Sequence, residues 1–472
     1  MNTVTGRFVI LNFFKKIIGT AAIQPLPSAP VANAVTIYTR SEHPISRTQI
    51  SAHALKVLYQ LKKSGYAAYL VGGCVRDLLL GREPKDFDVV TDATPDQIRK
   101  VFRNCRLIGR RFRLAHIYFG HEYIEVATFR GRADAENDDQ KFHESGQLLR
   151  DNIYGTIEED VWRRDFTVNS LYYNIRDFSV VDYTGGMQDH RAGVMKLIGD
   201  PVTRYREDPV RMLRAVRFAV KLGFVLDAEC QQPLRDLASL LHAIPSARLY
   251  EEFLKLFLSG YSLQTYEMLR HYGLFGALFP GVDRSLNEER QGFPKVFIAK
   301  AFENSDKRVA DGLPVTPYFL LAALLWDSVQ ALAKQKIAQG IPSIPAQQMA
   351  ASEIIGEQVQ RIAFPKYMGI AMRDVWYLQS RFHQQTGTRP FKLITHPRFR
   401  AAYDFLLLRA ETGDVEQQVA DWWTAFQVAE GTNQTAMTQA SSAKKSPQKR
   451  RHRSKSNRNK NSVDKPTVEK HD

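Results

Sequence analysis

Two adjacent stretches decide the fold: LVGGCVRDLLLG at residues 70–81 and KDFDVVTDAT at residues 85–94. The first predicts a strand, a tight turn at Gly72 and Gly73, and then a helix, because glycine permits the backbone conformations that close a turn. The second has the alternation of a strand, which places Asp86 and Asp88 on one face. Together they predict an α/β unit in which paired carboxylates follow a glycine turn.

The paired aspartates indicate a metal site. Two carboxylates on one strand face repel each other, so the arrangement is costly unless a cation offsets it. Mg²⁺ takes hard oxygen ligands and keeps waters for substrate phosphates, and two such ions can align an attacking hydroxyl with a leaving pyrophosphate. The other interpretation is an edge strand with two solvated acids. The glycine turn favours the metal site, because its backbone N–H groups can approach a phosphate.

Two further acids are candidates for a third ligand. Glu125 lies in the middle of the strand pattern YIEVATFR, where a carboxylate is expensive to bury without a metal or a partner. Asp165 lies in RRDFTVNSLYYN, where Arg163 and Arg164 precede it and offer an ion pair as the alternative. The sequence alone does not separate these roles.

The distribution of patterns predicts several packed units in a chain of 472 residues. Short strand patterns alternate with helices up to about residue 200, and helical periodicity dominates afterwards. We therefore expect an α/β head with a mixed sheet, all-α neck and body domains, and poorly ordered ends. The expected boundaries are 1–45 for a loosely ordered segment, 46–200 for the head, 201–265 for the neck, 266–430 for the body and 431–472 for a disordered basic tail.

The charge of the chain is concentrated at its C-terminal end. The formal net charge is +15, and residues 441–472 contain 11 Lys and Arg against 3 Asp and Glu, a net of +8. This segment has almost no large apolar residues, so it cannot bury a core. A basic arm of this kind most often binds RNA or DNA; a solubilising tail is the plainer interpretation.

Several classes of protein are excluded by composition. Three cysteines without paired spacing argue against a disulfide scaffold or a structural zinc site and favour a cytoplasmic protein. No apolar run reaches the roughly 20 residues that span a bilayer. The apolar run from Phe8 to Phe14 precedes Lys15 and Lys16, which is the wrong order for a signal peptide. A membrane-surface helix at 8–18 is the alternative to a frayed or partner-packed terminus.

Five motifs in unbroken order resemble those of class II nucleotidyltransferases, the family of bacterial poly(A) polymerases and bacterial-type CCA-adding tRNA enzymes. They are LVGGCVRDLLLG, KDFDVVT, IEVATFR, RRDFTVNSLYYN and REDPVRMLRAVRFAVKLGF. The resemblance implies a palm-like head followed by helical neck and body domains. It also implies ATP as substrate, two Mg²⁺ ions held by Asp86, Asp88 and Glu125, a catalytic role for Asp86, Asp88 and Asp165, and a triphosphate site at Gly72, Gly73, Arg76 and Asp77.

The neck motif begins at Asp208-Pro209, a typical helix start. Arg211, Arg214, Arg217 and Lys221 then form a basic stripe, of which the last two are expected to be solvated. The resemblance assigns recognition of the incoming base to Glu207, Asp208 and Arg211, with Arg214 beside them. An acid and a guanidinium can meet the donor and acceptor that adenine offers.

Three features favour the poly(A) polymerase branch. LIGRRFRLAHI resembles a segment of these enzymes and supplies Arg110, Arg111 and Arg113 for RNA; a solvated basic turn is the alternative. The later segments DVWYLQSRF and HPRFRAAYDFLLLRAE resemble the same branch, and the basic tail suits an enzyme that holds unrelated RNA 3′ ends.

The implied activity is addition of AMP to the 3′ ends of messenger and regulatory RNAs by a cytoplasmic monomer. RNA-decay enzymes and RNA chaperones are the implied partners. The rivals are a CCA-adding tRNA enzyme and a catalytically idle RNA-binding adaptor. The crowded Asp86/Asp88 pair argues against the adaptor, because an idle head has no reason to tolerate the repulsion.

Overall fold

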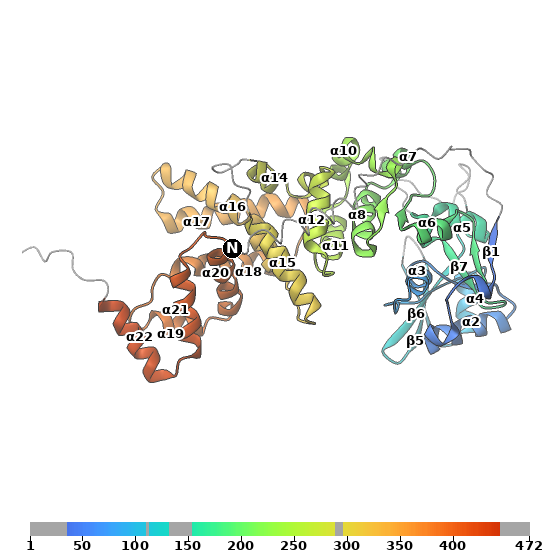
Figure 1. The fold of residues 1–472 in the computed structure, drawn as a ribbon, viewed down its shortest axis with the longest axis horizontal. Helices are drawn as coiled ribbons and strands as arrows, with labels where there is room; N and C mark the ends of the chain where they lie inside the picture. Colours follow the sequence, from blue (N-terminus) through green and yellow to red (C-terminus); the bar gives the residue numbers. More distant parts are fainter. Residues whose placement is uncertain (1–34, 110–112, 132–152, 288–295, 444–472) are drawn as a thin grey trace, which may run out of the picture. The chain divides into compact units, whose positions relative to one another are not determined.

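The structure is a computed structural model, and the chain divides into two compact units between Arg373 and Asp374. Figure 1 labels the elements of both units. Expectations for residues 8–18, for Arg110 and Arg111, and for the basic segment after residue 443 lie outside the described part of the chain. The residues that the structure describes are 35–109, 113–131, 153–287 and 296–443.

The head contains an eight-stranded sheet in the order β1-β8-β7-β2-β3-β6-β5-β4. β3 and β6 pair in parallel, and the other neighbours in this sheet pair antiparallel. The predicted mixed sheet is therefore confirmed. The strands are β1 (Thr36–Tyr38), β2 (Ala68–Val71), β3 (Asp88–Thr91), β4 (Cys105–Ile108), β5 (Leu114–Phe119), β6 (Glu122–Thr128), β7 (Leu171–Asn174) and β8 (Val180–Asp182).

Helices cover both faces of this sheet. On one face, apolar side chains of α2, α3 and α4 share a core with β5 and β6 residues such as Ile117 and Val126. On the other face, Val161 of α5 packs against Val90 and Tyr172. The helical elements of the head are η1 (Arg40–Glu42), η2 (Arg47–Gln49), α2 (Ala52–Lys63), α3 (Gly73–Leu79), α4 (Pro95–Val101), α5 (Ile157–Arg163), η3 (Thr167–Asn169) and α6 (Gly186–Ala192).

The described residues after the head are helical apart from one short pair of strands. β9 (Val194–Met195) and β10 (Val225–Leu226) pair in parallel and tie the end of the head to the neck. The neck elements are α7 (Pro201–Glu207), α8 (Val210–Leu222), α9 (Ala228–Gln231), α10 (Leu234–Leu237), η4 (Ala238–Ala243) and α11 (Ser246–Phe257). In Figure 1, α8 lies beside α11 and α12, and residues of these helices are in contact.

The remaining helices continue to the end of the described chain. Their bounds are α12 (Ser262–His271), α13 (Leu274–Leu278), α14 (Pro280–Asn287), α15 (Phe297–Ala310), α16 (Pro317–Ala338), α17 (Ser343–Arg361), α18 (Lys366–Arg381), α19 (Arg389–Ile394), α20 (Phe399–Glu411), α21 (Gln417–Val428) and α22 (Gly431–Ala443). In the second unit, Phe382, Trp423 and Phe426 are fully buried in one core. None of the described helices combines the length and apolarity needed to cross a membrane.

Three elements correct the sequence-based boundaries. β1 lies in the segment expected to be loosely ordered, and it forms by pairing with β8, far away in the sequence. The β9–β10 pair lies partly in the neck that was predicted to be all-α. α22 occupies the start of the predicted disordered tail, where Met437 packs against the core of the second unit. In each case a distant contact supplies the stability that the local pattern does not indicate.

Candidate functional site

The candidate site begins where β3 and β6 run side by side. The parallel register places Asp88 opposite Glu125, so these two carboxylates lie on the same face of the sheet. β3 begins at Asp88, and Asp86 lies in the bend before it. The prediction that both aspartates belong to one strand is therefore wrong in detail, although their charges still interact.

The electrostatics of Asp88 fit a cation site. Burial, and then the negative charges of Glu125 and Asp86, raise the pKa of Asp88 to about 6. The residue as a whole nevertheless remains exposed at the start of β3, so solvent can reach it. Within the part of the chain that the structure describes, neither aspartate side chain forms a hydrogen bond or an ion pair. The repulsion expected from the sequence is thus present: the charge of Arg164 lowers the pKa of Asp88, but burial and the two acids outweigh it.

The donor set fits Mg²⁺ in particular. The described residues contain no group of three or more His, Cys, Asp or Glu side chains placed to hold one metal ion. Mg²⁺ does not require such a cage, because one or two carboxylates, waters and substrate phosphates complete its octahedral shell. The carboxylates of Asp86 and Asp88, with the pKa of Asp88 raised and Glu125 in register with it, are sufficient for this kind of binding.

The glycine turn lies directly beside these carboxylates. β2 ends at Val71, opposite Asp88 in the sheet register, and α3 begins two residues later. Gly72 has φ of +78°, a conformation that other residues rarely adopt. A Cβ at this position would lie 3.9 Å from Asp88 Oδ2, so the turn passes within contact distance of the carboxylate. The predicted strand–turn–helix is confirmed.

Arg76 of α3 lies next to this turn and links it to two neighbouring side chains by hydrogen bonds. Its side chain is buried; its Nε and Nη2 donate to Asp77 Oδ1 at 2.9 and 2.7 Å, and its Nη1 donates to Asn169 Oδ1 at 2.7 Å. These bonds leave little of the guanidinium for a phosphate. The sequence analysis missed Asn169, whose position beside Arg76 depends on the packing of η3 against α3.

Asp165 has a different environment from Asp88. Its Oδ2 accepts hydrogen bonds from Nε and Nη2 of Arg214 on α8, and its Oδ1 accepts from the Phe166 backbone. Burial alone raises its pKa, but the Arg214 charge and these hydrogen bonds outweigh burial and lower it. Asp165 and Arg214 were both predicted to be site residues, and the structure joins them in an ion pair between head and neck. Their predicted roles in the site stay predictions.

Three arginines surround the ring of Phe218 on α8, close to the ion pair between Asp165 and Arg214. The guanidinium carbons of Arg76, Arg214 and Arg217 lie 5.4, 5.3 and 4.3 Å from its ring centroid. Arg217 also pairs with buried Glu252 at 3.8 Å. The expectation that Arg217 is solvated is therefore wrong, because α11 covers that side of α8.

The predicted base-reading residues form a polar cluster at the start of α8. Glu207 Oε2 accepts from Arg204 at 2.8 Å and from Arg211 at 2.9 Å. Asp208 Oδ1 accepts from the Val210 N–H at 3.2 Å, which satisfies a free donor at the start of α8. The helix begins one residue later than predicted, because Pro209 and not Asp208 occupies its N-cap position.

The other oxygen of Asp208 accepts from Arg248 of α11 at 2.7 Å. Arg204 and Arg248 were missed in the sequence analysis. No sequence spacing connects Arg248, 40 residues away, with Asp208.

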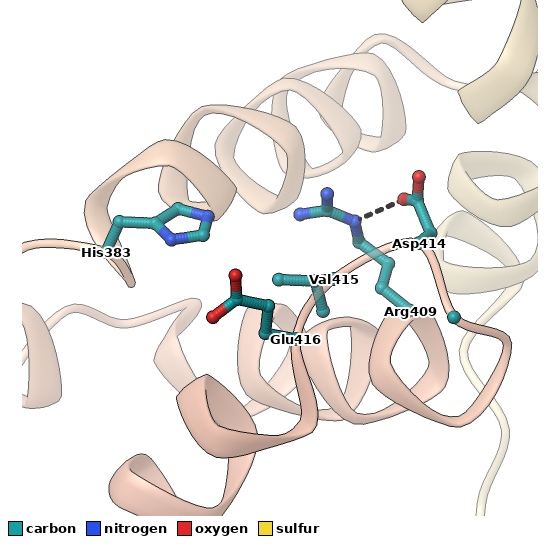
Figure 2. Close-up of a pocket in the computed structure, with 6 residues that line it drawn as sticks. His383, Arg409, Asp414, Val415 and Glu416 are labelled. Atoms are coloured by element: carbon teal, nitrogen blue, oxygen red, sulfur yellow. Dashed lines mark hydrogen bonds and ion pairs between the residues drawn. The ribbon is translucent and has the colours of Figure 1, made fainter.

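The basic cluster before β5 is described only at Arg113, which is exposed. A shallow pocket occurs elsewhere, in the second unit, between the end of α20 and the start of α21. Figure 2 shows Arg409 paired there with Asp414, while His383 and Glu416 face the same space. Two acids beside an already paired arginine make a poor phosphate site, so the acid-rich face of the head remains the candidate.

Comparisons with known families match this architecture. The family model "Poly A polymerase head domain" covers residues 68–196. The model "Probable RNA and SrmB- binding site of polymerase A" covers residues 223–286. A third model, "Polymerase A arginine-rich C-terminus", covers residues 339–458.

Individual relatives agree with the family models. The chain is 49% identical over 447 residues to poly(A) polymerase I of Salmonella typhi, covering 93% of this chain and 96% of the relative. It is 35% identical over 279 residues to a CCA-adding enzyme of Bacillus pumilus, covering 59% of this chain and 62% of the relative.

Among solved structures, the Bacillus stearothermophilus CCA-adding enzyme in complex with CTP aligns with a TM-score of 0.52 at 24% identity, covering 83% of this chain and 82% of that chain. This likeness concerns the fold. The sequence relationship extends along nearly the whole chain, and the chain therefore belongs to the poly(A) polymerase family of nucleotidyltransferases.

Proposed function

We propose that this chain is a template-independent polynucleotide adenylyltransferase that adds AMP from ATP to RNA 3′ ends. The observation that carries the proposal is the crowded acid face, where Asp88 is opposite Glu125 and beside the Gly72 turn without a cationic partner of its own. The relationship to poly(A) polymerase I along 93% of the chain supports the same activity.

Asp86 and Asp88 are the proposed ligands of two Mg²⁺ ions, with Glu125 beside them. When bound, the ions supply positive charge against the phosphates and the developing charge of the transfer. The residues of the chain position the triphosphate relative to these ions. Backbone N–H groups at Gly72 and Gly73 approach the triphosphate, while Arg76 holds the turn and Asp77 in place by the hydrogen bonds described above. Arg76 is thus proposed as a positioning residue.

Selection of the base is assigned to Glu207, Asp208 and Arg211. Arg204 and Arg248 hold the two acids in place. Adenine presents one donor and one acceptor on its pairing edge, which a carboxylate and a guanidinium can meet together. We propose Arg214 and Asp165 as the pair that fixes this part of the neck against the head, so that their effect on catalysis is indirect.

Primer extension with each nucleotide separately tests the activity. The proposal predicts that an unstructured RNA primer with Mg²⁺ is extended by many AMP residues from ATP and poorly from CTP. A CCA-adding enzyme would instead incorporate CMP and stop after completing the tRNA end. Efficient CMP addition, or no addition of any nucleotide, contradicts the proposal.

The partners follow from the same activity. The match of residues 223–286 to a probable RNA-binding region supports an RNA substrate held by the neck and body. We place the chain in the cytoplasm, where ATP and messenger and regulatory RNAs are available, and propose RNA-decay enzymes and RNA chaperones as partners. Recovery of such proteins with the tagged chain from ribonuclease-treated extract tests whether these contacts are direct.

A further inference from the structure

The face of the sheet that carries Asp88 continues outward to the edge strand. The registers place Asp88 opposite Glu125, Glu125 opposite His116, and His116 opposite Arg106 of β4. Residues opposite one another on neighbouring strands project to the same face. A row of four functional side chains therefore runs from the acid pair to the edge of the sheet.

Two tyrosines lie next to this row. Tyr123 precedes Glu125 by two residues on β6 and is opposite Tyr118 on β5. The His116 and Tyr123 rings stack with centroids 4.1 Å apart and planes inclined by 13°. The Tyr118 ring lies 5.8 Å from that of Tyr123, and the Arg106 guanidinium lies 5.2 Å from the Tyr118 ring. We name Arg106, His116, Tyr118 and Tyr123 the aromatic surface.

Packing of the sheet does not explain this surface. The core of β5 and β6 is made by Ala115, Ile117, Ile124 and Val126, which alternate with the aromatic residues and point to the opposite face. Tyr123 remains 51% exposed. Because His116 covers one side of its ring, the exposed area belongs to the other side and the edge.

Tyr123 and Arg106 are exposed, Tyr118 is half-buried, and His116 is buried beneath the Tyr123 ring. An exposed ring beside an arginine is what single-stranded nucleic acid requires. Bases stack on aromatic side chains whatever their identity, and a guanidinium pairs with the phosphate between them. His116 also donates to or accepts from Glu125 at 3.3 Å, which links the surface to the acid pair. The ring of Tyr123 is thereby held rigidly, and a preorganised ring loses little entropy when a base stacks on it.

We propose that the aromatic surface binds the last bases of the RNA primer, with one base stacked on Tyr123, and so delivers the 3′-hydroxyl to Asp86 and Asp88. The inference rests on the proposed function, which already assigns the ATP phosphates to the Gly72 turn and its base to the neck. The neck and body are proposed to hold the RNA, but its 3′ end, which must reach the acid pair, remains without a position. Stacking is indifferent to base identity, as an enzyme that tails unrelated RNAs needs.

The test compares Tyr123→Ala, Tyr123→Leu and Tyr123→Phe in the full chain. Each is assayed for primer KM and ATP KM by primer extension, and for quenching of 2-aminopurine at the primer 3′ end with Mg²⁺ and without ATP. Loss of one base–aromatic stack predicts a primer KM raised about tenfold for Tyr123→Ala and Tyr123→Leu. Quenching is lost in both, ATP KM is unchanged, and Tyr123→Phe, which keeps the ring, restores the affinity and the quenching.

Tyr59→Ala is the matched control. Tyr59 is 38% exposed and belongs to α2, which packs on the opposite face of the sheet, so its loss leaves primer KM and quenching unchanged. The thermal melting of every variant is followed by circular dichroism. Tyr123→Leu keeps a branched apolar side chain but no aromatic ring, so it tests stacking even where Tyr123→Ala unfolds.

The outcomes separate this inference from the proposed function. If the wild-type chain adds AMP while Tyr123→Ala and Tyr123→Leu retain normal primer KM and quenching, the aromatic surface is not the primer site. A rise in ATP KM with normal primer KM overturns the inference too, because the surface would then hold the nucleotide. If the wild-type chain adds no AMP, the proposed function fails, and the quenching measurement alone decides whether the surface binds RNA.

Discussion

Asp88 and Asp165 are both acids of the head, and their surroundings are opposite. Asp88 is opposite Glu125, close to Asp86, and its pKa is raised to about 6 by burial and by these two acids. Asp165 is bound by the Arg214 guanidinium, whose charge lowers its pKa despite burial. The Arg164 charge offsets only part of the repulsion on Asp88, whereas Asp165 has a guanidinium as its direct partner.

From this difference we propose that Asp88 takes part in catalysis and that Asp165 holds the fold together. The Asp165 oxygens accept from a guanidinium, a backbone N–H and the Asn169 amide, which leaves little capacity for a metal. We therefore propose that Asp165 joins head and neck. A carboxylate surrounded by other carboxylates has capacity to spare, and folding gains nothing from it. We therefore propose that the repulsion left among the carboxylates of the metal-free chain marks the metal-binding acids more clearly than their position in a motif does.

Substitution of Asp88 has the largest expected effect among the tests of this contrast. We expect Asp88→Asn to lower the rate of AMP addition by about 10³-fold or more, because the side chain can no longer bind a metal that supplies several kcal/mol of transition-state stabilisation. Single-turnover primer extension at saturating Mg²⁺ measures this. Glu83→Gln is the control, because it removes an exposed acid from the segment between α3 and β3. Near-normal activity of Asp88→Asn would refute the metal assignment.

The second test concerns the paired acid. Asp165→Asn or Arg214→Gln should lower the free energy of unfolding by about 3 kcal/mol, since each leaves its partner charge largely buried and unpaired. The double variant should recover part of this loss. Urea unfolding followed by circular dichroism and a double-mutant cycle give the coupling energy. A coupling near zero would mean that the pair is solvated and that the contrast with Asp88 is false.

The C-terminal segment extends the comparison to positive charge: like the acids near Asp88, its basic residues have too few partners of opposite sign in their own segment. Residues 441–472 carry a net charge of +8, with too few acids to pair internally, and we predict that they bind RNA phosphates. Removal of residues 444–472 should weaken RNA binding about tenfold at low salt and make the salt dependence shallower. Fluorescence anisotropy at two salt concentrations measures both, and AMP addition at saturating primer should be retained. Equal affinity at both salt concentrations would remove the segment from the binding site.

The smallest expected effect is the pH dependence of the thermal stability that Asp88 causes. The folded-state pKa of Asp88 lies above its ordinary value, so its ionisation disfavours the folded state as the pH rises from about 4 to 6 and at every higher pH. With metal chelated, Asp88→Asn should therefore match the wild type in Tm at pH 4 and exceed it by roughly 2–4 °C at pH 7. Mg²⁺ should reduce this difference in Tm, because it stabilises the wild type and not Asp88→Asn. Differential scanning fluorimetry measures this, and a gap that shrinks with rising pH would contradict the raised pKa.

Local patterns predicted the parts of the site that depend on neighbours in the chain. The Gly72 turn between β2 and α3 follows from glycine content and alternation, and the approach of Asp86 to Asp88 follows from their spacing. The sequence analysis also selected Glu125, because a carboxylate in an apolar strand pattern is conspicuous. It missed His116 beside it, although the same alternation puts His116 on the outward face of β5.

Contacts between distant segments could not be predicted in this way. The partners of Arg76, Asp165 and Asp208 lie 93, 49 and 40 residues away, and no periodicity relates such positions. The sequence even suggested the wrong partners for Asp165, its neighbours Arg163 and Arg164. Arg164 instead pairs with Asp160 at 2.8 Å.

The sequence by itself determined the chemistry of this protein: which acids crowd together, where the backbone turns for a phosphate, and that a mixed sheet precedes a helical chain. These features depend on residue type and short-range geometry, which each segment carries with it. Only the tertiary structure decided which charges remain unpaired, because compensation depends on the side chains that other segments bring within a few ångströms. Asp88 became a candidate metal ligand, and Asp165 a structural anchor, only when the strands and the neck helix came together.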